Sequence, residues 1–480
     1  MQKTVKKAAD IIKKHEYARV VSHYDADGIT SAGIICNALL REGIQFHTTI
    51  VSKLMSSFIQ GLNEELIIFC DMGTAQLDLI LKYLKEKGVI IIDHHAVPLT
   101  SGSNSTSINE LVSSLPSSFV HINPHCFGEW RENGGKMDGE VCAAGISYLV
   151  ARRLSSDDER YNIDLAGLAV AGTLGDKLEM NRGINKMILD EAIKEGVISV
   201  KKGLKLGDGK IRDLILFSTD PYIPLVGKVE WVDAFLNKAG IEGDRKVSDL
   251  EEEEERRLTT ALLSLSGESK AGASIGEDTL VGTTYILNAE VVRNGIDFMR
   301  IVDACGRFGK AGIGIGLCMR EEKMIEEATS LYTKFQSKLV SELNRIEGAE
   351  GNGIRELPNI FYFYVQESGI TGVLAGIIAE YLCTGKPVIV LNKKDGAGER
   401  EGVKAETKIS ARCNKKRISV SEGESEGIDL AKAMEKASKE VGGFGGGHPV
   451  ASGASIPEGS EEKFIAALDR IIGEQMRKIS

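Results

Sequence analysis

The sequence lacks any hydrophobic run long enough to cross a membrane, which would need about 20 consecutive apolar residues. It also lacks the continuous apolar segment that follows the basic start of a signal peptide, since residues 3–14 have the spacing of an amphipathic helix. We therefore expect no contact with a membrane and a cytoplasmic location. The sequence shows no internal repeat.

Paired cysteines and a basic excess are also missing. The eight cysteines include no C-x-x-C pair, which argues against a zinc ribbon or a disulfide framework. The 59 lysines and arginines are outnumbered by 69 aspartates and glutamates, giving a net charge of -10. General nucleic-acid binders usually carry a basic excess. Any polyanionic substrate must therefore be held by a local basic site or by metal ions.

The chain is long enough for more than one domain, with 480 residues, 42% of them hydrophobic and 27% charged. Its first part alternates amphipathic helices with aliphatic strands, which we expect at 17–22, 44–51, 65–70 and 89–92. This pattern indicates a parallel sheet covered on both faces, a doubly wound α/β domain. A smaller α/β unit follows near the carboxyl end. We expect a first domain over 1–195, an inserted connector region over 196–325 and a second domain over 326–480.

Carboxylates and imidazoles follow the predicted strands and one predicted helix. Because the carboxyl ends of parallel strands meet at one edge, these side chains are expected to converge there. Imidazole with carboxylate suits Mn²⁺, Zn²⁺ or Fe²⁺, whereas an all-oxygen set would suit Mg²⁺ or Ca²⁺. The sequence thus predicts a metal site, with candidates His23, Asp25, Asp27, Asp71, Asp93, His94, His95 and Asp176.

A structural interpretation competes with the metal site. The stretch after the first strand could be a polar turn, with Asp27 or Thr30 capping the next helix and Gly28 supplying the bend. Such a turn explains any one strand end, but it explains carboxylates at three strand ends poorly.

Two glycine-rich stretches need separate interpretations. Residues 303–316 show no strand before a G-x-G-x-x-G turn, so we expect a helix packed closely against the first domain instead of a phosphate loop. The glycines of 442–453 permit close approach to a ligand and donation of backbone N–H groups to an anion. The adjacent His448 makes a flexible linker the weaker alternative.

The ordered motifs together resemble the DHH phosphoesterase superfamily. The resemblance rests on His23-x-Asp25-x-Asp27-Gly28, Asp71, Asp93-His94-His95 and Gly175-Asp176. Gly445-Gly446-Gly447-His448 and Ser410-Ala411-Arg412 resemble the companion DHHA1 domain. Within the superfamily the chain looks most like archaeal RecJ-like exonucleases, including the GINS-associated nuclease. Its long insert, with Ala304-Cys305-Gly306-Arg307, and the lack of a carboxyl-terminal OB-fold extension favour that branch.

This resemblance implies a Mn²⁺-dependent exonuclease that acts on free ends of single-stranded DNA or RNA, in DNA replication or repair or in RNA processing. Two divalent ions are implied, with Mg²⁺ or Co²⁺ as substitutes for Mn²⁺. One ion would bind His23 and Asp25 and the other Asp27, His94 and Asp176, with Asp71 as the bridge. Asp93 would orient a histidine, and His95 would lie over the scissile phosphate. The implied substrate-binding residues are Ser410, Arg412, Gly445, Gly446, Gly447 and His448.

The sequence departs from the bacterial RecJ pattern at one position, and it allows several alternative functions. His23 stands where the bacterial RecJ subgroup commonly has Asp, which affects metal preference and substrate length. The implied partners are single-stranded nucleic acid and either the GINS complex or RNA-processing enzymes. A nanoRNase-like phosphoesterase acting on short oligonucleotides is the alternative enzyme. A catalytically inactive, RecJ-related replication scaffold is the alternative of another class.

Overall fold

The computed structural model of the chain divides into two compact units. Unit 1 comprises residues 1–203 and 283–333, and unit 2 comprises 204–282 and 334–480. The domain limits predicted at 195 and 325 remain predictions. No helix in the described part of the chain is long and apolar enough to span a membrane. The structure describes residues 1–95, 116–126, 131–132, 135–136, 140–154, 161–265, 277–348, 353–393, 406–414 and 427–477.

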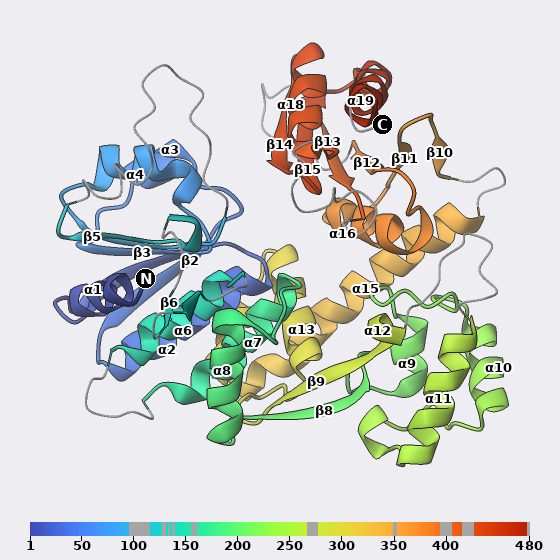
Figure 1. Ribbon diagram of the computed structural model, residues 1–480, viewed down its shortest axis with the longest axis horizontal. Coiled ribbons are helices and arrows are strands. Elements are labelled where there is room, and N and C mark those ends of the chain that lie inside the picture. Colours follow the sequence, from blue (N-terminus) through green and yellow to red (C-terminus); the bar gives the residue numbers. More distant parts are fainter. Residues whose placement is uncertain are drawn as a thin grey trace. The chain divides into compact units, whose positions relative to one another are not determined.

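Unit 1 is built on a five-stranded parallel sheet with the order β2-β1-β3-β4-β5 (Figure 1). The chain leaves β1 in one direction to form β2 and returns to its other side to form β3, so the strand order reverses at β1. The predicted doubly wound parallel α/β fold is confirmed. The strands are β1 (Tyr17–Ser22), β2 (Gln45–Ile50), β3 (Leu66–Cys70), β4 (Gly88–Ile92) and β5 (Phe119–Ile122).

Helices bury both faces of this sheet (Figure 1). Ile68 and Ile90 point toward the side of α1 (Gln2–Ile12), α2 (Ala26–Arg41) and α6 (Ala143–Arg152). Ile67 and Ile91 point the other way, toward α3 (Ser56–Gln60) and α4 (Leu77–Leu84). Burial on both sides explains why these strands are aliphatic throughout and do not alternate with polar residues.

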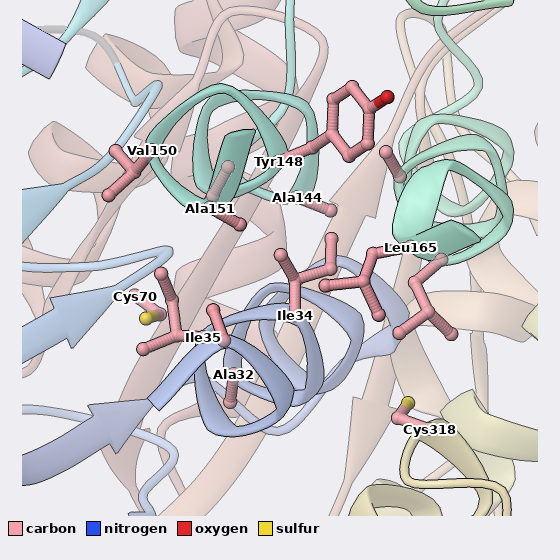
Figure 2. Packing of buried hydrophobic residues seen from close by; sticks show 14 of the residues in the cluster. Ala32, Ile34, Ile35, Cys70, Ala144, Tyr148, Val150, Ala151, Leu165 and Cys318 are labelled. Carbon is pink, nitrogen blue, oxygen red and sulfur yellow. The ribbon is translucent and has the colours of Figure 1, made fainter. Parts of the chain in front are cut away.

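Helix α2 is the centre of the larger core. Its Ile34 packs among residues of α6 and the segment before α7 (Ala166–Gly175), including Ala144 and Leu165 (Figure 2). On another side, Gly33 allows close approach of Cys318 in α14 (Ala311–Cys318), whose Cβ would lie 2.3 Å from a Cβ at position 33. Within the 303–316 stretch, a Cβ on Gly314 would lie 3.1 Å from Cγ2 of Ile29 in α2, so the predicted close packing is confirmed. The stretch forms parts of two helices, α13 (Gly295–Arg307) and α14.

The remaining elements of unit 1 surround this core. Two strands that the polar sequence did not predict, β8 and β9, pair with each other. These elements are η1 (Thr74–Gln76), η2 (Pro124–Cys126), β6 (Arg131–Glu132), β7 (Gly135–Lys136), η3 (Ile163–Leu165), α8 (Gly183–Lys194), β8 (Ile198–Leu204), β9 (Val281–Leu287) and η6 (Glu322–Met324).

Unit 2 contains a mixed sheet with the order β10-β11-β12-β13-β15-β14, in which only the β11–β12 pair is parallel. Helices α18 and α19 cover one face through a shared apolar core. The predicted smaller α/β domain is confirmed. Its elements are β10 (Arg355–Glu356), β11 (Phe361–Tyr364), α16 (Thr371–Ile377), the π-helical η7 (Ile378–Leu382), β12 (Val388–Asn392), β13 (Glu406–Arg412), α18 (Leu430–Glu440), β14 (Phe444–His448), β15 (Ala451–Pro457) and α19 (Glu461–Met476).

A helical lobe within unit 2 has its own core, which includes Ile215, Val232 and Leu258. Helix α15 (Ile325–Gly348) contains the change from unit 1 to unit 2 after Thr333, as expected for a helix that joins two domains. The lobe consists of α9 (Ile211–Leu216), α10 (Val229–Ala239), η4 (Val247–Asp249), α11 (Glu252–Ser264) and α12 (Glu277–Leu280).

A glycine in α13 allows this helix to touch the loop after β1. A Cβ on Gly306 would lie 1.6 Å from the carbonyl oxygen of Tyr24, whereas one on Gly312 in α14 would meet nothing within 4 Å. We predict that Gly306→Ala lowers the free energy of unfolding by about 2 kcal/mol through overpacking. Gly312→Ala should leave it unchanged or raise it by up to about 1 kcal/mol, since alanine is the better helix former. Urea unfolding of both variants measures the difference, and equal stabilities would contradict this packing.

Candidate metal centre

The sheet itself positions the first candidate ligands. Its parallel hydrogen-bond pattern continues one residue beyond the strands: His23 N–H donates to the Cys70 carbonyl (3.3 Å) and Asp71 N–H to the Ile92 carbonyl (2.8 Å). Residues directly after β1 and β3 thus lie on neighbouring strands, where the strand order reverses. In sheets of the order 2-1-3-4-5, this switch point is where ligands bind.

His23, Asp25 and Asp71 form one cluster. The Nδ1 atom of His23 lies 2.8 Å from Oδ2 of Asp25 and 3.4 Å from Oδ2 of Asp71. Asp25 also caps α2, because its Oδ1 accepts the Gly28 N–H at 3.0 Å. The expectation that Asp27 or Thr30 would be the cap is wrong. Asp25 instead combines capping with a second oxygen directed toward His23.

Asp27, His94 and Asp176 form a second cluster. The Nε2 atom of His94 lies 3.2 Å from Asp176 Oδ2, 3.7 Å from Asp27 Oδ2 and 3.3 Å from Asp71 Oδ1. Asp27 is 1% exposed, and its carboxylate accepts the backbone N–H groups of Ala143 and Ala144 at the start of α6, each at 2.8 Å. The positive end of a helix dipole therefore holds this buried charge in place.

Asp93 and His95 form a hydrogen-bonded pair beside these clusters. Asp93 Oδ1 accepts the backbone N–H groups of His94 (2.8 Å) and His95 (3.1 Å), and it lies 2.7 Å from Nδ1 of His95. Asp93 thus orients the imidazole of His95, while the imidazole of His94 faces Asp27, Asp71 and Asp176. Nδ1 of His95 lies 3.7 Å from Asp71 Oδ1.

Three buried polar residues that the sequence interpretation missed support this pair. Thr74 donates its backbone N–H to Asp93 Oδ2 at 2.8 Å, and its hydroxyl lies 2.9 Å from Nε2 of His121. The side chain of Asn123 donates to that hydroxyl and to the His95 carbonyl, both at 2.9 Å. Asn123 directly follows β5, as His23 follows β1 and Asp71 follows β3, and that position was the available signal.

The charge distribution of the clusters fits a bound cation. Burial and the charge of Asp27 raise the pKa of Asp176 to about 9, and burial and the charge of Asp71 raise that of Asp27 to about 6. Burial opposes protonation of His94, yet contacts with Asp71, Asp27 and Asp176 raise its pKa to about 10. Without a metal, the clusters therefore hold protons to offset crowded negative charge.

Several buried ligand atoms without hydrogen-bond partners also fit a bound cation. Within the described residues, Nδ1 of His23, Oδ1 of Asp71 and Oδ2 of Asp176 are buried without a partner in hydrogen-bond geometry. The candidate ligand atoms fall into sets within 4.8 Å of one another: His23 with Asp25 and Asp71, Asp27 with His94 and Asp176, and Asp71 with His94 and His95. Such nitrogen and oxygen donors fit divalent transition metals, and Asp71 belongs to two of the sets.

The residues predicted to bind substrate gather in unit 2. Ser410 and Arg412 are on β13, and Gly445, Gly446, Gly447 and His448 are on β14. The glycines therefore form an edge strand and not an open loop. Gly445 and Gly447 permit close packing, since added Cβ atoms would lie 2.8 Å from the carbonyl oxygens of Met434 and Ala451, respectively.

Two known protein families match separate parts of the chain. Residues 18–173 match the DHH family, N-terminal domain, and residues 358–474 match the DHHA1 domain. A protein of Methanocaldococcus jannaschii, itself uncharacterized, is 31% identical over 98% of this chain and 96% of its own length. This chain belongs to the DHH superfamily. The predicted resemblance is confirmed.

RecJ proteins also match, at lower identity, so this chain is a RecJ-like member of the superfamily. The single-stranded-DNA-specific exonuclease RecJ of Bacillus subtilis is 24% identical over 68% of this chain, which spans 42% of that protein. RecJ of Thermus thermophilus in complex with Mn²⁺ has the same fold (TM-score 0.56, 17% identity, 98% of this chain and 55% of that chain), and it has also been solved with Mg²⁺. CDC45 of Entamoeba histolytica matches over 97% of both chains (TM-score 0.64, 12% identity).

The network around Asp93 gives a test of how this site is supported. We predict that Thr74→Val lowers the free energy of unfolding by about 2 kcal/mol, because the isosteric side chain leaves buried partners at His121 and Asn123 unsatisfied. Thr260→Val is the control, since that exposed hydroxyl only bonds back to the Arg256 carbonyl within α11. It should change stability by less than about 0.5 kcal/mol. Urea unfolding measures both, and a neutral Thr74→Val would refute the network.

Proposed function

We propose that this RecJ-like protein is a divalent-metal-dependent exonuclease that hydrolyses phosphodiester bonds at free ends of single-stranded DNA or RNA. The observation that carries the proposal is a pair of ligand sets, one of His23, Asp25 and Asp71 and the other of Asp27, His94 and Asp176. Asp71 connects the two sets, because its Oδ1 lies 3.3 Å from Nε2 of His94. Nuclease sites with two metal ions about 3.5–4 Å apart need such a shared ligand between two groups of donors. Each set also joins residues from separate elements, which further supports this assignment. The first set combines the ends of β1 and β3, and the second combines α2, the end of β4 and the end of α7.

Each proposed ligand keeps the role that the resemblance implies. His23 and Asp25 would hold one ion, Asp27, His94 and Asp176 the other, and Asp71 both. The bound ions would supply a nucleophilic hydroxide at neutral pH and neutralise charge on the phosphate. Mn²⁺ suits the mixed nitrogen and oxygen donors better than Mg²⁺ does, and Co²⁺ would be accepted on the same ground.

The remaining side chains act on the substrate. The hydrogen bond that the His95 ring donates to Asp93 raises the pKa of His95, and burial only partly offsets this rise. A charged imidazole at this position favours an anionic phosphate and can donate a proton as the bond breaks. In unit 2, Arg412 would hold a second phosphate, helped by Ser410, His448 and the backbone of Gly445–Gly447.

Two alternatives lead to different expectations. A nanoRNase-like enzyme would use the same metal ligands but would prefer strands of a few nucleotides. The fold match to CDC45 is compatible with the alternative of an inactive scaffold. Such a scaffold would not need intact ligand sets. All the candidate ligands are present here, which favours catalysis. Association with the GINS complex or with RNA-processing enzymes is compatible with an active nuclease.

Metal binding can be tested without activity. We predict that Mn²⁺ at 100 times its dissociation constant raises the free energy of unfolding of the wild type by about 2.7 kcal/mol for each ion that binds. Asp71→Asn should reduce this gain to below about 0.5 kcal/mol without destabilising the metal-free protein, because Asn tolerates the left-handed backbone of Asp71 (φ 58°). Asp78→Asn on the exposed side of α4 removes the same charge and should keep the full gain. Urea unfolding with and without Mn²⁺ decides, and full stabilisation of Asp71→Asn would exclude the shared-ligand role.

Substrate class can be tested with end-labelled strands. We predict Mn²⁺-dependent shortening of linear single-stranded 30-mers of DNA or RNA, little action on blunt duplex, and none on closed single-stranded circles, because cleavage needs a free end. Asp71→Asn should lower the rate at least 100-fold. Gel analysis of 3-mers and 30-mers in parallel separates the choices: activity confined to 3-mers would favour the nanoRNase-like alternative, and cutting of circles would contradict an exonuclease.

A further inference from the structure

One face of the unit 2 sheet carries side chains that its core does not use. Along β13, Thr407, Ile409 and Ala411 are buried, whereas Lys408 and Arg412 alternate with them and are partly exposed. The buried residues Ile409 and Ala411 belong to the apolar core shared with α18 and α19. Alternation along a strand therefore directs Lys408 and Arg412 away from that core.

Strand register arranges this face in three rows. Lys408 pairs with Ser455, which pairs with Phe444; Ser410 pairs with Gly453 and then Gly446; Arg412 pairs with Ala451 and then His448. Directly opposed residues project to the same side of an antiparallel sheet. The face therefore presents an aromatic ring with a cation in its first row, almost no side chains in its second, and cationic or titratable groups in its third.

Phe444 is unusual in this position because it is 56% exposed on a strand that is otherwise rich in glycine. The Nζ atom of Lys408 lies 5.8 Å from the centre of its ring and 3.1 Å from Oγ of Ser455. These contacts agree with the register in placing Phe444 and Lys408 on one face. Glu406 lies outside this row, two residues before Lys408 on β13, and its carboxylate is 3.6 Å from Lys408 Nζ.

The glycines of the middle row are not required by internal packing. A Cβ on Gly453 would meet only the carbonyl oxygen of Ile409, at 3.4 Å, and one on Gly446 would meet nothing within 4 Å. The face is therefore open over the glycines of β14 and β15. At β13 it is bordered by α16, where a Cβ on Gly372 would lie 3.1 Å from Nη2 of Arg412 and 3.6 Å from Oγ of Ser410. From residue 444 to residue 448 a strand extends about 13 Å, which is longer than one nucleotide.

We propose that Phe444 is a stacking platform for a base of single-stranded nucleic acid whose sugar-phosphate backbone runs along the glycine row between Lys408 and Arg412. This inference rests on the proposed function and deepens it. Every base has a π-face, so stacking would hold a strand without reading its sequence. The positive charges of Lys408 and Arg412 suit the phosphates. Glu406, which precedes Lys408 on β13, would repel phosphates beyond Lys408.

A binding experiment with the full chain tests the platform. Dye-labelled pentathymidine and an abasic pentamer, both with phosphorothioate linkages that slow hydrolysis, are titrated in Mn²⁺ and followed by fluorescence anisotropy. Wild type should bind the thymidine pentamer about tenfold more tightly, which is about 1.4 kcal/mol and within the range for one stacked base. Phe444→Ala should lose this preference and bind the abasic pentamer as before, while Phe444→Tyr should restore it.

A second variant tests the path of the backbone. Gly453→Val suits a strand and should fold, as circular dichroism can verify, but its side chain should weaken binding of both pentamers at least fivefold. If Phe444→Ala keeps the base preference, or weakens both pentamers equally, the platform is overturned while the exonuclease proposal stands. If the wild type binds neither pentamer, the proposed function itself fails.

Discussion

The register of the parallel sheet at its switch point is the constraint on which the metal centre depends. Adjacent strands lie about 4.8 Å apart, and the backbone pairing of β1, β3 and β4 continues to His23 and Asp71. Ligands placed one residue past neighbouring strands are therefore held at nearly the spacing that a shared metal site needs. A slip of one residue in β3 would turn Asp71 to the opposite face of the sheet.

Holding so many carboxylates together requires local compensation, and three of them receive it from backbone N–H groups. Asp93 accepts those of His94 and His95, Asp27 accepts the first N–H groups of α6, and Asp25 caps α2. Asp176, at the end of α7, receives no such support, and its raised pKa reflects that. The centre is thus strong in acceptors and short of positive charge, which is the condition that a divalent cation relieves.

Sequence reasoning found the parts that depend on local pattern. Tyr17–Ser22 was predictable as a strand because its run of apolar residues is typical of a strand buried on both faces, and most of the ligands were predictable because they follow such strands. Thr74 and His121 were missed because their contact joins segments 47 residues apart, with nothing in the local pattern to show it. Asn123 was missed although it directly follows β5. The strand Phe444–His448 was also unexpected, since glycine weakens strands and only pairing with β15 makes one here.

Under the proposed function, the acidity of the chain affects how nucleic acid can be bound. With a net charge of -10, the protein cannot collect nucleic acid by its overall field. Unit 2 offers local cations at Lys408 and Arg412, whereas unit 1 without metal offers mainly carboxylates that repel a phosphate. Metal must therefore bind to unit 1 before the scissile phosphate can approach it. Attraction at one unit and metal-gated chemistry at the other would confine hydrolysis to strands that engage both.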